Sequence, residues 1–205
     1  MQRMDGCARS TEGTSVATCV PFFFHLLNYS LNMPGVFLVG FMGAGKTSVG
    51  RRLSQRLGWR FEDLDDRIVA REGQSIEQIF RESSEAAFRR AEHAALRELV
   101  GDMGESPVVV ALGGGAFAQT DNLALLAEHR VTTVFLDAQV EELLRRCREE
   151  GKARPLAREE ADFRRLYEER RASYLSASLC IVTAGKDVET VVEEVARKLR
   201  LDSNL

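Results

Sequence analysis

The segment Gly40–Thr47, with the sequence GFMGAGKT, constrains the fold of this 205-residue chain more than any other feature. It matches the pattern G-x-x-x-x-G-K-[ST], and it follows an apolar run and precedes a helical one. In that setting the glycines let the backbone wrap around phosphate groups, and the N–H groups at the helix start supply partial positive charge. The alternative is a glycine-rich turn that matches by chance, and the order of strand, loop and helix weighs against it. We therefore predict a site for ATP or GTP in an α/β fold.

The residues of this loop that are predicted to bind the nucleotide are Gly43, Ala44, Gly45, Lys46, Thr47 and Ser48. Lys46 is expected to reach the β and γ oxygens. The hydroxyl of Thr47 is a candidate ligand for Mg²⁺. The groups needed to hold a triphosphate thus lie in one short segment.

Composition indicates one domain in a reducing compartment. With 44% hydrophobic residues, the chain can bury one ordinary core but scarcely two. Its 28 basic and 31 acidic residues are interleaved, which argues against nucleic acid as the main partner. The cysteines form no C-x-x-C pair and no metal-ligand spacing; they are Cys7, Cys19, Cys147 and Cys180. We therefore expect a cytoplasmic protein without disulfides or structural zinc.

Residues 1–33 precede the first strong strand and show no clear period of 3.6 or 2. Their apolar stretch, 16–27, is shorter than the roughly 20 residues that cross a membrane. No small-residue cleavage site follows this stretch, so a signal peptide fits poorly. We expect a disordered or non-native leader over 1–33, a domain over 34–205 and no membrane partner, with Met33 as the candidate start.

From Pro34 onward, short apolar β-branched runs alternate with helical stretches, as in βαβ units around a buried parallel sheet. The predicted strands are 36–39, 60–62, 108–112, 131–136 and 179–182. The predicted helices are 46–57, 75–80, 85–100, 140–148, 162–174 and 188–199. Ser75 and Gln78 form a capping box. The segment 149–160 has mixed charge and no apolar stripe, so we predict a mobile loop there.

Two carboxylates, Asp63 and Asp65, come just after the second predicted strand, in a stretch that we expect to stay extended. Extended geometry would place both on one side, facing the P-loop at the carboxyl ends of the strands. One could then hold Mg²⁺ through water and the other accept a hydroxyl proton. The alternative is helix capping, with Asp65 or Asp66 starting a helix.

Helical spacing separates the two arginines that follow Phe88. Arg89 shares a face with Glu92, whereas Arg90 and His93 share a polar face that we expect to be solvent-exposed. An inward arginine suits a bidentate grip on a carboxylate, which makes Arg89 the candidate. The alternative is an exposed ion pair with Glu85, four residues earlier.

Three consecutive glycines, Gly113, Gly114 and Gly115, follow the third predicted strand. Such a run is costly unless something must approach the backbone closely. A bound ligand is the natural reason, and the alternative of a plain tight turn would need only one or two glycines.

The ordered set GFMGAGKT, FEDLD, FRRAE, LGGGA, KARPL and ERRASY resembles the shikimate kinases over residues 35–200. The resemblance implies a three-layer α/β/α fold of the nucleoside monophosphate kinase type, with a five-stranded parallel sheet and a lid at about 149–160. It also implies that ATP phosphorylates the 3-hydroxyl of shikimate, a step toward chorismate and the aromatic amino acids. The expected partners are shikimate and ATP, the expected cofactor is Mg²⁺, and a monomer is expected.

The resemblance also implies roles for individual residues. The predicted shikimate-binding set is Asp65, Arg89, Gly113, Gly114, Gly115 and Arg170, with Arg171 as the rival of Arg170. Thr47 and Asp63 would lie at Mg²⁺, Arg146 against the adenine, and Lys186 near the nucleotide. Arg154 would be a lid arginine over the transferred phosphoryl group.

Phosphoryl transfer depends mainly on positioning and charge stabilisation. We therefore expect Lys46, Arg154 and Mg²⁺ to stabilise charge while Asp65 orients the attacking hydroxyl, with Asp63 as the alternative base. The rival hypotheses are a kinase of another small acceptor, such as gluconate or a nucleoside monophosphate, and an ATP-gated regulatory module that turns nothing over. The Asp pair and the three glycines weigh against the rival kinases.

Overall fold

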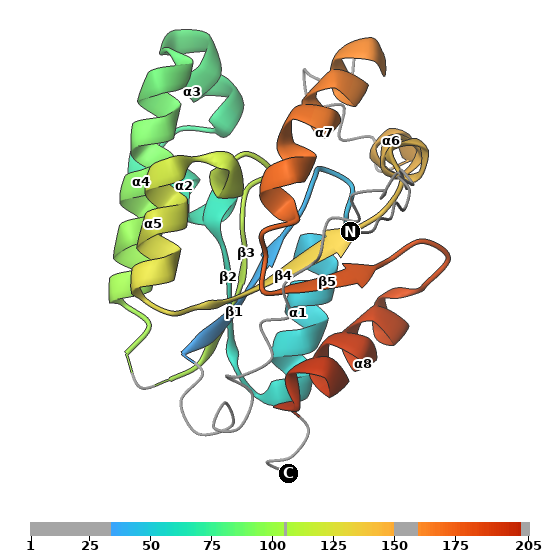
Figure 1. The fold of residues 1–205 in the computed structure, drawn as a ribbon. Helices are drawn as coiled ribbons and strands as arrows, with labels where there is room; N and C mark the ends of the chain where they lie inside the picture. Colours follow the sequence, from blue (N-terminus) through green and yellow to red (C-terminus); the bar gives the residue numbers. More distant parts are fainter. Residues whose placement is uncertain (1–33, 105, 150–159, 202–205) are drawn as a thin grey trace, which may run out of the picture.

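The computed structural model describes residues 34–104, 106–149 and 160–201. Its centre is one parallel sheet with the strand order β2-β3-β1-β4-β5, shown in Figure 1. The strands are β1 (Gly35–Val39), β2 (Arg60–Asp63), β3 (Val108–Ala111), β4 (Thr132–Asp137) and β5 (Leu179–Val182). Every strand pair is parallel, so all five carboxyl ends meet at one edge of the sheet. The predicted α/β fold is confirmed.

Burial follows the order of the strands. The central strands β1 and β3 are buried along their whole length, and their sequences GVFLV and VVVA are continuous apolar runs because helices cover both faces. The edge strands β2 and β5 are more exposed. The core therefore lies around β1, directly below the loop that follows it.

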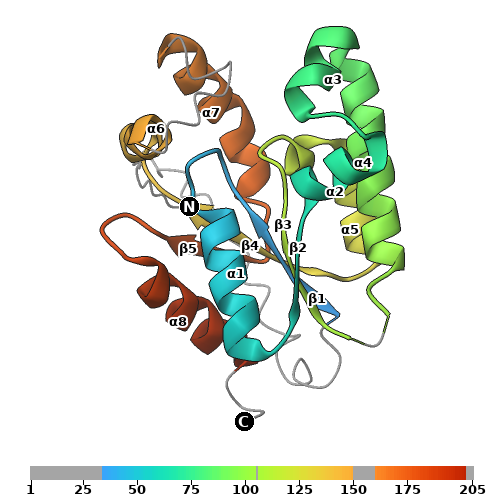
Figure 2. The same cartoon turned by 180° about the vertical axis from the view of Figure 1, so that it is seen from behind.

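The helices are α1 (Lys46–Leu57), α2 (Leu64–Glu72), α3 (Ile76–Glu82), α4 (Glu85–Gly101), α5 (Thr120–Glu128), α6 (Val140–Glu149), α7 (Glu160–Tyr174) and α8 (Val188–Leu199), with a 3₁₀ turn η2 (Ala116–Ala118). Helices α1 and α8 pack together on one face of the sheet, and α4 and α5 lie on the other, as Figures 1 and 2 show. Helices α3 and α7 stand on opposite sides of the carboxyl edge. Three layers result, as expected.

Most element bounds were predictable, and the exceptions have physical reasons. The predicted bounds of α1, α8 and β5 are confirmed, as is the capping box of Ser75 and Gln78. Helix α5 was not predicted, because its N-cap residue Gln119 provides no side-chain cap that would mark the start. Expecting His93 to face solvent was wrong: it is half-buried, and its Nδ1 lies 2.8 Å from Asn122 Oδ1 on α5.

Within the described residues, no helix is both long and apolar enough to cross a membrane. The predicted leader, 1–33, lies outside those residues, as does the predicted loop except for Glu149 and Glu160, which end α6 and begin α7.

Removing residues 1–32 is expected to change kcat and KM by less than about twofold and Tm by less than about 2 °C. The reason is that β1 begins at Gly35, so all five strands and the P-loop follow the removed segment. Steady-state kinetics and thermal melts of the full and truncated chains test this. An inactive or insoluble truncated chain would show that the segment belongs to the fold.

Candidate active site

The loop between β1 and α1 has the backbone of a phosphate cradle. Gly43 and Gly45 adopt left-handed conformations, with φ of 78° and 83°, which residues with a side chain rarely adopt. A Cβ on Gly43 would lie 2.7 Å from the carbonyl oxygen of Leu143 on α6, so the loop packs directly against that helix. Lys46 extends back over the loop, and its Nζ donates to the carbonyl oxygens of Gly40 at 2.9 Å and Phe41 at 3.0 Å. The ammonium group thus lies over the loop that is predicted to hold phosphate.

Thr47 and Asp63 meet beside this loop, although they come from different elements. The Thr47 hydroxyl donates to Asp63 Oδ2 at 2.8 Å, while Asp63 Oδ1 accepts from the backbone N–H of Asp65 at 3.1 Å. A hydroxyl and a carboxylate at this distance fit the hard oxygen ligands that Mg²⁺ prefers. In the described part of the chain no group of three acidic, histidine or cysteine side chains could hold a metal alone. A metal here would need water and nucleotide oxygens as further ligands.

The expected geometry of the aspartates needs correction. Helix α2 begins at Leu64, so Asp65 lies in its first turn and not in an extended strand. The alternative is also corrected, because Asp63, and not Asp65 or Asp66, is the N-cap of α2. Both side chains nevertheless line one cavity, because a helix start turns Asp65 toward the carboxyl edge of the sheet.

A cavity of about 480 Å³ joins the phosphate loop to three of the predicted acceptor residues, Asp65, Gly113 and Gly114. The other three, Arg89, Gly115 and Arg170, are not among the residues that line it. The residues that line it are Met42, Gly43, Gly45, Lys46, Thr47, Ser48, Arg51, Asp63, Asp65, Asp66, Ala111, Leu112, Gly113, Gly114 and Cys147. One continuous space is therefore bordered by the P-loop, both aspartates and the glycine turn.

Arg89 lies at the wall formed by α4 and the glycine turn. Its side chain is 17% exposed, and its guanidinium donates to Glu92 at 2.9 Å and to Glu85 at 3.2 Å. The ion pair with Glu85 was predicted as the alternative to an inward position of Arg89. The structure shows both, since Arg89 is largely buried and still pairs with Glu85. The Nε of Arg89 is buried and has no hydrogen-bond partner among the described residues. A buried donor without a partner favours a ligand that supplies an acceptor.

The glycine turn permits close approach of charged side chains. A Cβ on Gly115 would lie 2.6 Å from Arg89 Nη1, and one on Gly113 would lie 2.7 Å from Asp65 Oδ1. Hydrogen bonds also hold the turn, since Tyr174 donates to the carbonyl of Gly114 and Asn122 Nδ2 donates to that of Ala116 at 3.0 Å. The three glycines are thus used for side-chain approach, as well as for the turn itself.

Sequence reasoning assigned no role to Glu92, although it placed this residue on the face of Arg89. The side chain of Glu92 is 1% exposed, and burial raises the pKa of its carboxyl, against the opposing effect of the Arg89 guanidinium. Its Oε1 lies 3.4 Å from the Cβ position of Gly113, close to Asp65. The sequence did contain a signal for Glu92, because it is a charged residue on the inward face of a predicted helix. Tyr174 also lies at the site, although sequence reasoning assigned it no role beyond its spacing from Arg170. Burial raises the pKa of its hydroxyl to about 12.

The two adjacent arginines of α7 separate clearly. Arg170 Nη1 lies 3.7 Å from the Cβ position of Gly114, so Arg170 is beside the glycine turn. Arg171 instead donates to Asp137 at 3.2 Å and to the hydroxyl of Tyr167 at 3.0 Å. Geometry therefore favours Arg170 over its rival as a ligand-binding residue.

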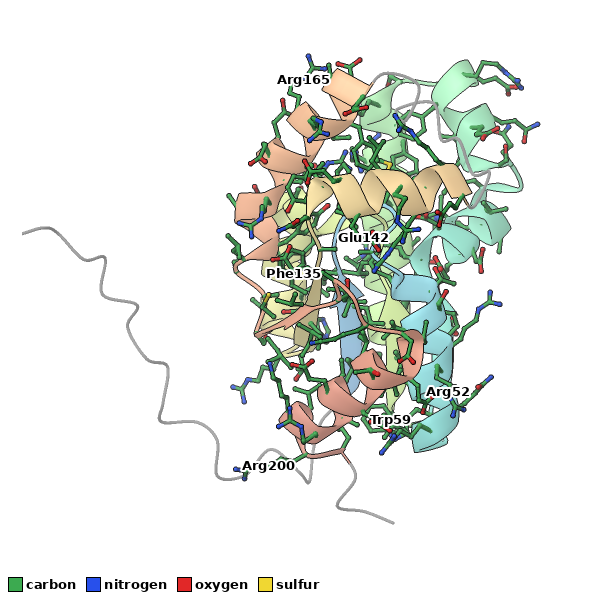
Figure 3. All side chains as sticks on the ribbon, turned by 90° about the vertical axis from the view of Figure 1, so that its right-hand side faces the viewer. Arg52, Trp59, Phe135, Glu142, Arg165 and Arg200 are labelled. Atoms are coloured by element: carbon green, nitrogen blue, oxygen red, sulfur yellow. The ribbon has the colours of Figure 1, made fainter. Side chains whose placement is uncertain are left out.

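Two of the remaining predicted residues, Arg146 and Lys186, are not among the residues that line the cavity. Arg146 donates to Glu142, labelled in Figure 3, at 2.8 Å and to the carbonyl of Thr183 at 3.3 Å. Lys186 pairs with Glu194 on α8 at 2.5 Å. Arg154 lies outside the described residues. The roles of these three residues remain predictions.

Substituting Gly115 by alanine is expected to raise KM for a substrate that binds to Arg89 about tenfold without loss of stability. The backbone at Gly115 has φ of −106°, which alanine tolerates, but the new Cβ would displace the guanidinium of Arg89. Steady-state kinetics and a thermal melt measure the two effects. Gly101→Ala is the matched control, because nothing lies within 4 Å of that Cβ position. An unchanged KM for Gly115→Ala would contradict the contact.

A P-loop joined through one cavity to an acidic pair and a glycine turn, with Arg89 and Arg170 beside that turn, on a five-stranded parallel sheet, defines a small-molecule kinase. The family model described as shikimate kinase matches residues 42–200. The chain belongs to the shikimate kinase family.

Individual relatives agree with this assignment. The shikimate kinase of Geobacter metallireducens is 45% identical over 163 residues, which cover 78% of this chain and 88% of the relative. That of Persephonella marina is 34% identical over 168 residues, which cover 82% of this chain and 100% of the relative. Among solved structures, the Acinetobacter baumannii shikimate kinase in complex with shikimate is 33% identical with a TM-score of 0.76, covering 85% and 97%. A Sinorhizobium meliloti gluconokinase, 20% identical with a TM-score of 0.58 and covering 84% and 99%, shares the fold alone.

Proposed function

We propose that this chain transfers the γ-phosphoryl group of ATP to the 3-hydroxyl of shikimate, giving shikimate 3-phosphate. The observation that carries the proposal is the single cavity that connects Lys46 and Thr47 with Asp65 and the glycine turn. Donor and acceptor can therefore be held in one space, which is most of what phosphoryl transfer requires.

The acceptor side suits a hydroxylated carboxylic acid. A guanidinium has five N–H donors, and the described contacts of Arg89 occupy only part of them, leaving the buried Nε available. We assign Arg89, beside Gly115, and Arg170, beside Gly114, to the substrate carboxylate. The backbone of Gly113, Gly114 and Gly115 would border the ring. Asp65 would then accept a hydrogen bond from the hydroxyl on the side of the P-loop.

On the donor side, the N–H groups of Gly43, Ala44, Gly45, Lys46, Thr47 and Ser48 would cradle the phosphates. Bound Mg²⁺, held by Thr47 and through water by Asp63, would neutralise charge on the β and γ oxygens. Arg146 and Lys186 are assigned to the nucleotide, and Arg154 to the transferred group, as predictions from the family pattern.

The mechanism that we propose depends on positioning and charge. Lys46 moves from the Gly40 and Phe41 carbonyls to the phosphate oxygens, and it stabilises the charge that develops there. Asp65 orients the attacking hydroxyl and accepts its proton. Asp63 is the alternative base, and both of its oxygens accept hydrogen bonds in the structure.

ADP release, coupled to a spectrophotometric readout, tests the proposal directly. We expect release that depends on shikimate and on Mg²⁺, and little release with gluconate or without an acceptor. Release with gluconate would favour the rival kinase, and release with no acceptor at all would indicate an ATPase. Absence of turnover with retained ATP binding would favour a regulatory module. We also propose that the protein is a cytoplasmic monomer that binds neither nucleic acid nor membranes. Size-exclusion chromatography tests whether it is a monomer.

A further inference from the structure

The carboxyl end of α7 carries two arginines that point to different parts of the molecule. Arg170 lies beside Gly114, and its charge acts on Glu92 and Tyr174. Arg171 lies on the neighbouring side of the helix, about 100° around its axis. It contacts the end of β4.

Arg171 belongs to a polar contact that joins α7 to the sheet. Its Nε donates to the hydroxyl of Tyr167 at 3.0 Å, and its Nη2 donates to Asp137 Oδ2 at 3.2 Å. The same Tyr167 hydroxyl donates to the carbonyl of Ala138 at 3.2 Å. We call Arg171, Tyr167 and Asp137 the Arg171 clasp. The clasp ties one turn of α7 to the last residue of β4 and the residue after it.

The other contacts of α7 with the sheet are mainly ring contacts. Phe163 and Tyr167 meet Phe41 of the P-loop edge to face, with ring centroids 5.0 and 5.6 Å apart. Tyr174 stacks on Phe135 of β4 at 5.3 Å. Such contacts hold the helix against the sheet, whereas directional hydrogen bonds fix its rotation. Two sets of hydrogen bonds supply this direction near Arg170: the one from the Tyr174 hydroxyl to the Gly114 carbonyl, and those of the clasp, which fix the helix at Tyr167 and Arg171.

Small rotations of α7 are large at the tip of Arg170. At a side-chain radius of about 6 Å, a rotation of about 10° moves the tip by roughly 1 Å. A misplacement of about 1 Å at a substrate-binding group can cost on the order of 100-fold in rate. The rotation of α7 therefore bears directly on the acceptor site.

We propose that Arg171 is a positioning residue for the phosphoryl transfer, which acts through Tyr167 and Asp137 to hold α7 in the rotation that brings Arg170 to the substrate carboxylate. This inference rests on the proposed function of Arg170. An ordinary surface ion pair would contribute little, but Asp137 is only 16% exposed and Tyr167 is buried, so the partners of Arg171 are fixed by packing.

The test is steady-state kinetics on Arg171→Ala, Arg170→Ala and the double variant, each with a thermal melt. We expect Arg171→Ala to raise KM for shikimate roughly 5- to 20-fold while KM for ATP changes less than about twofold. Because Arg171 acts through Arg170, the double variant should resemble Arg170→Ala alone within about twofold. Two further variants should show the same selective rise in KM for shikimate: Tyr167→Phe, which keeps the ring and removes the hydroxyl, and Asp137→Asn. They replace Arg171→Ala in the test if that variant folds poorly.

Arg165→Ala is the matched control, since this arginine of α7 pairs only with Asp162 and Glu169 among the described residues and is 70% exposed, at the outer end of the helix in Figure 3. It should leave both KM values unchanged. The inference is overturned if Arg171→Ala behaves like Arg165→Ala, if the effects of Arg170→Ala and Arg171→Ala multiply, or if only Tm falls. An unchanged KM in Arg170→Ala overturns it as well, yet wild-type turnover of shikimate would still support the proposed function.

Discussion

Replacing Arg89 by alanine is expected to lower kcat/KM for shikimate about 30- to 1000-fold, mainly through KM. The loss of a charge-assisted contact in a desolvated site costs about 2 to 4 kcal/mol. Here the loss also leaves the buried carboxylate of Glu92 without the guanidinium that partners it. Steady-state rates with shikimate varied at saturating ATP measure the effect.

Two further variants at this helix sharpen the experiment. Arg90→Ala should change little, because Arg90 lies on the exposed face of α4. Arg89→Lys should restore activity only in part, since an ammonium cannot reproduce the planar fork of a guanidinium. Equal effects at positions 89 and 90, or a defect of Arg89→Ala confined to KM for ATP, would show that the residue or its ligand was wrongly chosen.

Asp65→Asn is expected to lower kcat by about 100- to 10,000-fold while ATP affinity stays nearly unchanged. Asparagine keeps the shape of the side chain, and the backbone N–H that Asp63 caps is unaffected, so the start of α2 should persist. What is lost is the acceptor for the hydroxyl proton. The measurements are single-turnover rates for chemistry and calorimetry for ATP binding.

Asp66→Asn is the control for this second variant, because Asp66 also lines the cavity but is more exposed. It should retain most of the rate. Asp63→Asn should instead alter the dependence on Mg²⁺, since Asp63 is paired with Thr47. If Asp65→Asn weakened ATP binding alone, the proton-accepting role would have to pass to another group.

The parts of the site that the sequence predicts are those encoded by local geometry. The P-loop is a short segment whose glycines and helix start carry the whole signal. Helical spacing likewise separates Arg89 from Arg90, because an inward face depends only on the period of α4. Both follow from neighbours within about two turns of the chain.

The parts that escaped prediction depend on packing between distant segments. Asp65 was expected in a strand because nothing local decides between one more extended residue and a capped helix start at Asp63. The pairing of Glu92 with Arg89 is a local contact, but its burial requires that α4 pack against the glycine turn. The Arg171 clasp joins positions 34 residues apart. Spacing alone suggested Arg170, and it could not place Arg171 at the end of β4.

The strand order β2-β3-β1-β4-β5 also has a consequence for synthesis on the ribosome. The first three strands along the chain are neighbours in the sheet, so they can pair before β4 has been translated. At that stage one edge of β1, a strand that is buried along its whole length in the finished fold, has no partner. An apolar edge without a partner promotes association between chains. Arrival of β4 closes this edge, and only later does Arg170 emerge. We therefore expect a nascent chain that ends before β4 to need chaperone protection, and one that ends before α7 to bind nucleotide more readily than substrate.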